Sequence, residues 1–518
     1  MTAAQAPSWG VRRHAETYVD SVLLLTATRA MQDVDGITWA TALMATPANV
    51  DAVRDQGVSD PLLDELSASD LLLAVQGDEG IIEAALAAGD DALWGERASS
   101  GPVDTPLAER DLDASVARLP GANVAIVSVP GPFAALEAHK ALRAGLDVLL
   151  FSDNVSLDEE IELKEHAAEA GRLVMGPGAG TAALGGCGLG FSNVVRRGRV
   201  GVVAAAGTGA QEAMSLLDRW GEGVTQVIGV GGRDLSSEVG GRMAALAVRA
   251  LDRDPATELI LLVSKPPSPV AARAVVEAAG ATPTVAALVG LAESEGIGGA
   301  TAVARTLEGG VRAVFAALGV PVPEDGGRLR QDVEQALVGL DPTRTVVRGV
   351  YSGGTLCYEA LTVLEPWLGP VWSNTPLDKR HRVPAPPGAH TCLDLGEEEY
   401  TSGRPHPMID PEARLEVLSD VAEEPDVAVV LLDVVLGYGS HPDPAALLAP
   451  ACAELAGPAG PRAVVYLLGT DGDPQDLSRQ RAAFREAGAL VAPTGARAAL
   501  AAAAVARRDA SIVDSSLP

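Results

Sequence analysis

The sequence has few of the residues that mark a secreted, membrane-bound or metal-binding protein. Its 518 residues contain four cysteines, which have neither metal-ligand spacing nor the density of a disulfide scaffold: Cys187, Cys357, Cys392 and Cys452. No apolar run approaches the roughly 20 residues of a membrane helix. Charged residues such as Arg12 and Glu16 precede any apolar run, which argues against a signal peptide. We therefore expect a soluble, cytoplasmic protein with no membrane contact and no metal site.

Basic residues are also scarce. The chain has 39 Lys and Arg against 69 Asp and Glu, a net charge of −30, and only four of the basic residues are lysines. A nucleic-acid surface needs a basic footprint, so this charge excludes such a partner. A small anionic substrate must then be held by local Arg, Lys or backbone N–H groups against the overall field.

Aromatic residues make up only 3% of the chain, whereas 47% of the residues are hydrophobic. This composition is typical of parallel sheets covered by alanine-rich helices, and strand-like runs recur at βα spacing. We predict an α/β protein with three parallel sheets, of which the second and third have about five strands each, the size of a flavodoxin-like sheet. The predicted boundaries are 14–175 for the first domain, 176–320 for the second, 321–343 for a linker and 344–518 for the third.

The main motif is one phrase that occurs twice, at Val202–Ala213 and at Val346–Ala360. Each copy reads as an apolar strand, a Gly-Thr turn and a helix with the spacing G-T-x-x-x-E-A. A glycine turn that opens a helix presents backbone N–H groups to an anion. The duplication favours two related anion-binding domains, and an ordinary βα turn with a threonine cap is the alternative.

Several stretches resemble the FdrA family, a relative of the succinyl-CoA synthetase superfamily. They run in the family's order from near residue 14 to the end of the chain: Thr46–Asn49, Phe151–Lys164, Phe191–Gly198, Ala206–Glu212, Ile228–Gly241, Val263–Pro267, Tyr351–Ala360, Ser402–Pro411 and Leu431–Gly439. The resemblance implies an N-terminal Rossmann-like domain of the CoA-binding type, followed by two flavodoxin-like domains of the ligase-CoA type. It also implies a subunit that acts with two others in an oxamate carbamoyltransferase, which interconverts oxalurate and phosphate with oxamate and carbamoyl phosphate in purine (allantoin) catabolism.

The sequence departs from a CoA ligase at two places. The expected first turn of a CoA-binding domain, Thr26–Ala30, contains no glycine to let a pyrophosphate approach the backbone. The region that corresponds to the ligase phosphohistidine loop, Gly296–Thr301, contains no histidine, so a phospho-enzyme route lacks its nucleophile. We expect that no cofactor is required; binding of CoA or a nucleotide remains an alternative.

The two turns supply the candidate anion-binding residues. A carbamoyltransferase needs donors around phosphate and the carbamoyl oxygen, and a group that holds the carboxylate of the acceptor. The N–H groups and hydroxyls of the turns are candidates for this contact: Gly207, Thr208, Gly209, Gly354, Thr355 and Leu356. Asp394 and Asp433, at apolar strand ends, orient a water or Arg404, or else cap helices.

Four side chains are the candidate catalytic residues. Arg233, in a glycine run, is expected to bind a carboxylate or phosphate, or else to pair with Asp234 or Glu238. Lys265 follows a strand and precedes two prolines, so it neutralises substrate charge or is simply solvated. Arg404 and His406 lie in a proline-rich loop where they could bind an anion and move a proton, or only shape the loop. Glu212 and Glu359 are interpreted as structural residues in the first turns of their helices.

Two other functions stay open at this point: an acyl-CoA synthetase or succinate-CoA ligase-like enzyme that binds CoA, and a non-catalytic scaffold subunit that binds a metabolite. The sequence leaves undetermined the carbamoyl acceptor, the subunit that supplies the acid–base group and the stoichiometry of a homo- or hetero-oligomer.

Overall fold

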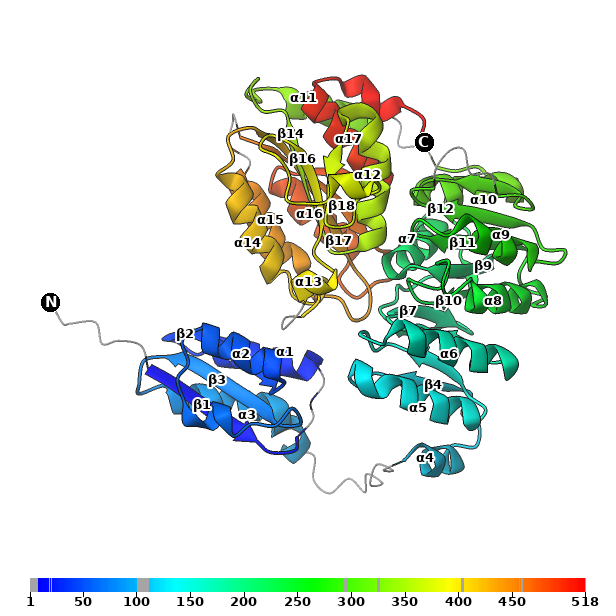
Figure 1. The fold of residues 1–518 in the computed structure, drawn as a ribbon. Helices are drawn as coiled ribbons and strands as arrows, with labels where there is room; N and C mark the ends of the chain where they lie inside the picture. The colour runs from blue at the N-terminus through cyan, green and yellow to red at the C-terminus, as the bar shows by residue number, and fades with distance from the viewer. Residues whose placement is uncertain are drawn as a thin grey trace. The chain divides into compact units, whose positions relative to one another are not determined.

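The computed structural model of the chain describes residues 8–17, 19, 21–99, 111–291, 297–323, 327–401, 405–455, 457 and 460–517. They divide into two compact units (Figure 1). The first unit comprises residues 1–108 with 401–405, and the second comprises 109–400 and 406–518.

The first unit is an α/β domain with an antiparallel sheet. Its strands, in the order β1-β3-β2, alternate with helices along the chain. The elements are β1 (Ser8–His14), α1 (Ser21–Gln32), β2 (Ile37–Met44), α2 (Pro47–Asp55), the 3-10 helix η1 (Pro61–Asp64), β3 (Leu71–Gly77) and α3 (Ile82–Ser99). Its core lies between the sheet and α1 and α3, around Met31, Leu71 and Leu73.

This unit corrects two predictions. Ser21–Thr26 is the first half of a helix, not the first strand of a Rossmann-like domain. Its run of Val and Leu pointed to a strand, but Ala27 and Met31 continue an apolar face at helical spacing, and both are fully buried. Thr26–Ala30 is therefore helix rather than a phosphate-binding turn. The segment 14–175 is not one domain, because it is divided between the two units.

The second unit begins with a small parallel sheet in the order β4-β5-β6, flanked by helices. We call this part the small lobe; its elements are α4 (Leu112–Arg118), β4 (Val124–Val127), α5 (Gly131–Arg143), β5 (Asp147–Leu150), α6 (Leu157–Glu169) and β6 (Val174–Met175). A capping box between Ser156 and Glu159 fixes the start of α6.

The middle lobe contains the first copy of the duplicated phrase. It comprises β7 (Thr181–Leu184), β8 (Cys187–Gly190), β9 (Arg197–Ala205), α7 (Gly207–Arg219), β10 (Val224–Gly229), α8 (Arg242–Asp252), β11 (Leu259–Ser264), α9 (Pro269–Glu277), β12 (Thr284–Leu288), β13 (Ala302–Ala304) and α10 (Leu307–Leu318). The sheet order is β13-β12-β11-β9-β10-β7-β8, with β7 and β8 antiparallel.

The C-terminal lobe contains the second copy. It comprises α11 (Arg328–Leu337), β14 (Val346–Tyr351), α12 (Gly354–Leu368), β15 (Val371–Trp372), the 3-10 helix η2 (Lys379–His381), β16 (His390–Asp394), α13 (Glu398–Thr401), α14 (Glu412–Ala422), β17 (Val427–Val435), α15 (Pro444–Leu455), β18 (Arg462–Leu468), α16 (Leu477–Glu486), β19 (Leu490–Ala492), α17 (Gly495–Arg507) and the 3-10 helix η3 (Ala510–Asp514). The sheet order is β15-β16-β14-β17-β18-β19.

The two larger lobes share one topology. If the parallel strands are numbered within each lobe, leaving out β7, β8 and β15, both sheets have the flavodoxin-like order 2-1-3-4-5. The α/β fold class with parallel sheets is confirmed. The segment 321–343 is more than a linker, because α11 lies within it and buries Leu329 and Val333 in the core.

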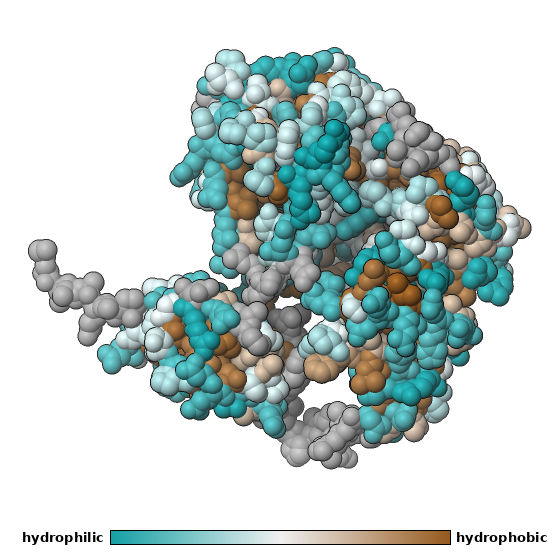
Figure 2. Space-filling model, in the orientation of Figure 1, coloured by the Kyte–Doolittle hydropathy of each residue, from teal (hydrophilic) through white to brown (hydrophobic). Residues whose placement is uncertain are grey.

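One hydrophobic core extends through both larger lobes. It joins Val202 and Leu261 of the middle sheet to Leu431 and Tyr466 of the C-terminal sheet through helices α7, α10, α12 and α17. Figure 1 shows α12 beside α17, with α7 adjacent to this pair. Figure 2 shows hydrophilic residues over most of the drawn face, as the net charge of −30 leads one to expect.

We predict that Gly353→Ala destabilises the chain by about 1–3 kcal/mol, because a Cβ at this position would overlap Thr208 across the boundary between the larger lobes. Chemical denaturation checks this. Gly232→Ala is the matched control, since a Cβ there meets no atom within 4 Å. Equal stability of the two variants would contradict the close packing of the lobes.

Candidate functional site

The two Gly-Thr turns meet at the boundary between the larger lobes. A Cβ on Gly209 would lie 2.9 Å from Thr355 Cγ2, and one on Gly353 would overlap Thr208. Each threonine therefore packs against a glycine of the other copy. Thr208 and Thr355 are 7% and 1% exposed, and Leu356 is buried in the core. The prediction of two separate open anion sites at these residues is wrong, because the turns fill each other.

The backbone at the tips of the turns keeps some exposure. Gly207 is exposed, Gly354 is partly buried and Gly209 is buried. Neither α7 nor α12 has a side-chain hydrogen bond at its N-cap. The Thr355 hydroxyl is buried and has no hydrogen-bond partner among the described residues. Anion binding by backbone N–H groups stays a prediction for Gly207 and Gly354.

Side chains from both larger lobes gather beside Gly354. A Cβ on Gly354 would lie 2.5 Å from Asp394 Oδ2 and 2.8 Å from Lys265 Nζ. Lys265, from the end of β11, also lies 3.4 Å from Glu397 Oε1 and 5.8 Å from the centre of the Tyr358 ring. We call Lys265, Gly354, Asp394, Gly396, Glu397 and His406 the Asp394 cluster.

The charges of this cluster are strongly coupled. Burial raises the pKa of Asp394 to about 7; the ammonium group of Lys265 opposes this rise and Glu397 adds to it. Burial by itself lowers the pKa of Lys265, but the carboxylates of Glu397 and Asp394 outweigh it, and the pKa is raised overall. A cationic lysine thus lies beside a carboxyl group that gains and loses a proton near neutral pH, as a general acid–base group must.

His406 reaches the same cluster from the loop before α14. A Cβ on Gly396 would lie 2.7 Å from His406 Nε2 and 3.2 Å from Asp394 Oδ1. The N–H of Met408 lies 3.3 Å from His406 Nδ1 and donates to it, which places the proton of the neutral ring on Nε2. Burial lowers the pKa of His406 to about 4, so the ring is neutral at pH 7.

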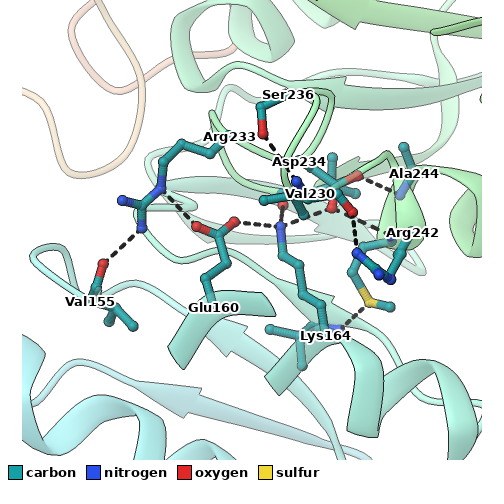
Figure 3. A network of polar contacts seen from close by, with 12 residues as sticks. Val155, Glu160, Lys164, Val230, Arg233, Asp234, Ser236, Arg242 and Ala244 are labelled. Carbon is teal, nitrogen blue, oxygen red and sulfur yellow. Dashed lines mark hydrogen bonds and ion pairs between the residues drawn. The ribbon is translucent and has the colours of Figure 1, made fainter. Parts of the chain in front are cut away.

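Arg233 belongs to a different cluster (Figure 3). Its Nε donates to Glu160 Oε2 at 2.7 Å and its Nη2 donates to the Val155 carbonyl at 2.8 Å. The fully buried Lys164 bridges Glu160 and Asp234, at 2.8 Å from each. Asp234 also accepts the N–H of Ala244 near the start of α8. Arg233 thus joins the small and middle lobes and pairs with Glu160 instead of Asp234 or Glu238. Its contact with a substrate stays a prediction.

Asp433 is also structural. It is fully buried, and it accepts from the N–H of Ser352 at 2.8 Å and from the Ser352 hydroxyl at 3.0 Å. Arg414 Nη2 lies 3.3 Å from Asp433 Oδ1, the same oxygen that accepts the Ser352 N–H. These contacts use the carboxylate within the C-terminal lobe, which leaves it buried and not open to a substrate. The expected contact of Asp433 with Arg404 stays a prediction. Arg404 itself lies outside the described residues.

Glu212 and Glu359 form a buried pair between the larger lobes. Glu359 of α12 accepts the N–H groups of Leu307 and Glu308 at the start of α10, at 2.7 and 3.3 Å. Glu212 of α7 accepts from Tyr466 and from the N–H of Gly495 at the start of α17. Each is therefore structural, but it caps a helix of the other lobe instead of its own first turn.

Each carboxyl group caps a helix of the other lobe because of its position within its own helix. Glu212 and Glu359 lie six residues into α7 and α12, where the N–H groups of their own helices are already bonded. Burial raises the pKa of Glu212 to about 7 and that of Glu359 to about 8, with the charge of Glu212 adding to the second shift.

Sequence reasoning found part of the Asp394 cluster. It selected Lys265, Gly354, Asp394 and His406, which the structure brings together. It missed Glu397 and Gly396. The available signal for Gly396 was the similarity of Cys392–Gly396 to Val227–Asp234, the corresponding strand end in the middle lobe. Tyr358 lies beside the Lys265 ammonium group. Apart from its place in the duplicated phrase, nothing in the sequence marked it as a site residue.

Comparison with known proteins places the larger lobes in a known superfamily. Residues 350–505 match the CoA-ligase family, 195–315 the CoA binding domain, and 10–106 the family described as AllF, heavy metal-associated domain. The uncharacterized protein YahF of Escherichia coli (strain K12) is 37% identical over 495 residues, 93% of this chain and 96% of YahF. The chain belongs to the YahF family. That family lies within the succinyl-CoA synthetase-like superfamily.

More distant similarities cover only parts of the chain. A succinate-CoA ligase [ADP-forming] alpha subunit of Aquifex aeolicus is 28% identical over 151 residues, which are 28% of this chain and 48% of the ligase subunit. The structure of ATP citrate lyase from Methanothrix soehngenii matches with 20% identity over 42% of this chain and 38% of the lyase, at a TM-score of 0.30. The CoA binding domain match falls on the middle lobe of this YahF family member, and not on residues 14–175.

The described residues of the first unit do not fit a heavy-metal site. Residues 10–106 contain no cysteine. His14 lies 2.8 Å from Asp90, and Asp70 accepts the N–H groups of Ser67 and Glu16. No group of three or more His, Cys, Asp or Glu residues with metal-binding geometry occurs in the described part of the chain. Within the described residues, no helix is both long enough and apolar enough to cross a membrane.

We predict that stability falls as the pH rises from about 5 to about 8. Glu212 and Glu359 bind more protons in the folded chain than in the unfolded chain over this range, because burial raises both pKa values from 4.5. Glu359→Gln removes one of these groups, so it should flatten the pH dependence and raise stability at pH 8 by on the order of 2 kcal/mol.

Denaturation at pH 5.5 and pH 8 measures this effect. Glu222→Gln is the control, since Arg199 lowers the pKa of Glu222 and its removal should not improve stability at pH 8. A wild-type protein that is more stable at pH 8 than at pH 5.5, with the same slope in Glu359→Gln, would contradict the assigned protonation.

Proposed function

We propose that the chain is the FdrA-like subunit of a carbamoyltransferase of the oxamate type, acting with two other subunits. The observation that supports this most is the Asp394 cluster, in which Lys265 of one lobe meets Asp394 and the Gly354 turn of the other. A cation, a partly exposed helix start and a carboxyl group of near-neutral pKa are groups that a non-covalent transfer of a carbamoyl group can use.

The reaction transfers a carbamoyl group between a phosphate oxygen and the nitrogen of oxamate. In the synthetic direction the oxamate nitrogen attacks the carbamoyl carbon, a C–N bond forms, the C–O bond to phosphate breaks and the nitrogen loses a proton. Asp394 accepts that proton and passes it to the departing phosphate, while Lys265 and the N–H of Gly354 balance the phosphate charge. Neutral His406 donates through Nε2 to an oxygen of the reacting group. Phosphorolysis of oxalurate follows the same steps in reverse.

A CoA ligase-type function is the second candidate, because the two larger lobes match the CoA-ligase and CoA binding families. Two features count against it. The stretch Gly296–Thr301 contains no histidine that could carry a phosphoryl group. The small lobe has three parallel strands in its described part, and the turn after the first of them contains the single glycine Gly131, whereas a dinucleotide site has a glycine-rich turn there. A non-catalytic scaffold is the third candidate, in which the complex needs the chain but not its Asp394 cluster.

We predict that the reconstituted complex phosphorolyses oxalurate to carbamoyl phosphate, and that Asp394→Asn and Lys265→Ala each lower kcat by about 10²–10⁴-fold, because they remove the proton acceptor and the phosphate contact. Release of carbamoyl phosphate is the measurement. Lys140→Ala is the matched control, since Lys140 pairs with Glu137 on the surface of α5. Unchanged rates in Asp394→Asn would favour the scaffold.

Thermal shifts separate carbamoyl transfer from a ligase function. Carbamoyl phosphate should raise the unfolding temperature of the wild-type chain and leave that of Lys265→Ala unchanged, because ligand binding stabilises only the state that holds the ligand. CoA at the same concentration should cause no shift. The reverse pattern, in which CoA raises the unfolding temperature and carbamoyl phosphate does not, would establish the CoA-binding function instead.

A further inference from the structure

A second cluster of cations lies between the larger lobes. A cavity of about 640 Å³ is lined by Val194, Val195, Arg196, Asp218, Arg219, Asp471, Gly472, Leu477 and Arg481. A smaller adjoining cavity of about 120 Å³ shares Arg219 and Arg481 with it and adds Arg328, Asp332 and Arg485. Neither cavity has a residue of the Asp394 cluster in its lining, so this site is separate from that cluster.

The charge at this site is opposite to that of the chain. The two cavities are lined by five arginines and three aspartates, whereas the whole chain carries a net charge of −30. Two of the three aspartates are already paired, Asp218 with Arg196 at 2.9 Å and Asp332 with Arg328 at 3.9 Å. A local excess of arginine in an acidic protein attracts small anions and is not needed for solubility.

Arg481 is the unusual member of the cluster. Its Nε and Nη2 atoms are buried and have no hydrogen-bond partner among the described residues. Burial, together with the nearby cations of Arg219 and Arg485, lowers the pKa of Arg481 to about 10, although Tyr466 and Asp471 oppose this shift. A buried guanidinium with unsatisfied N–H groups destabilises the folded chain unless an anion pairs with it.

Arg219 is held in position for the same ligand. Its Nη2 donates to the Pro493 carbonyl at 2.6 Å and its Nη1 donates to the Tyr466 hydroxyl at 3.3 Å. Arginine forks placed in this way bind phosphate oxygens in pairs. Val194 and Leu477 give the larger cavity an apolar wall for an organic group.

We propose that these joined cavities bind a phosphate-bearing metabolite, with Arg481 and Arg219 as its ligands. The phosphate lies between the two guanidinium groups, and the organic part extends into the larger cavity. The site is also connected to the boundary between the lobes, because Arg219 donates to Tyr466 and Tyr466 donates to Glu212. The proposal does not depend on the carbamoyltransferase function.

Isothermal titration calorimetry of the full chain with inorganic phosphate, pyrophosphate and ADP, at matched ionic strength in KCl, tests this site. We expect saturable binding of at least one of them, and binding at least about tenfold weaker in Arg481→Gln, since charge-assisted hydrogen bonds are lost. Preference for ADP over pyrophosphate identifies an organic phosphate, and the opposite preference identifies a free inorganic anion. Absence of saturable binding by all three probes in the wild-type chain overturns the proposal.

Two further variants separate this site from structural roles and from the Asp394 cluster. Arg479→Gln, on the same helix α16 but paired with Asp443 at 2.7 Å, should bind the probe as the wild type does. Lys265→Ala should also retain binding; its loss there, with retention in Arg481→Gln, would assign the anion to the Asp394 cluster and overturn the proposal.

The unfolding temperature of Arg481→Gln without ligand is a second measurement. Because Arg481→Gln removes an unpaired buried charge, its unfolding temperature without ligand should equal or exceed that of the wild type. A clear decrease would mean that Arg481 supports the fold, and would overturn the proposal even if binding were weakened.

Discussion

The structure of the second unit depends on the exchange of carboxylates between its two larger lobes. Glu359 of the C-terminal lobe binds the start of α10 in the middle lobe, and Glu212 of the middle lobe binds the start of α17 in the C-terminal lobe. Helix starts have unpaired N–H groups and a positive end of the dipole, so a buried carboxylate satisfies both. The two lobes therefore fold as one body around a common core.

This exchange buries two carboxyl groups away from water. Burial disfavours the charged form of each carboxyl group and raises the pKa of both Glu212 and Glu359, and the charge of Glu212 adds to the rise for Glu359. The same helices α7 and α12 start at the Gly-Thr turns, so locking the carboxylates also brings the turns into contact. Once the turns are in contact, Lys265 of the middle lobe can lie beside Gly354 and Asp394 of the C-terminal lobe. The Asp394 cluster exists only because the lobes are joined.

The sequence predicted the repeated architecture because local signals were enough for it. Apolar strands such as Val427–Val435 are buried along their whole length, and the duplicated phrase marks the first strand and helix of each lobe. The packing of Thr208 on Gly353 could not be predicted, because a turn that binds an anion and a turn that binds another turn have the same local sequence. The first unit was misjudged for a related reason: Ser21–Thr26 has strand-like residues, and only the burial of Ala27 and Met31 identifies the helix.

The arginines show most clearly where sequence reasoning ends. Arg233 was selected because it lies in a glycine run, yet Glu160, 73 positions away in the sequence, pairs with it in the folded chain. Arg481 was not selected, because it lies within an ordinary amphipathic helix, yet its buried Nε and Nη2 atoms have no hydrogen-bond partner in the part of the chain that the structure describes. Whether an arginine is available to a ligand depends on which acidic residues the fold brings to it. In a chain where acidic residues outnumber basic ones 69 to 39, an unpaired arginine is an exception that the fold must create, and such exceptions are where anion sites should be sought.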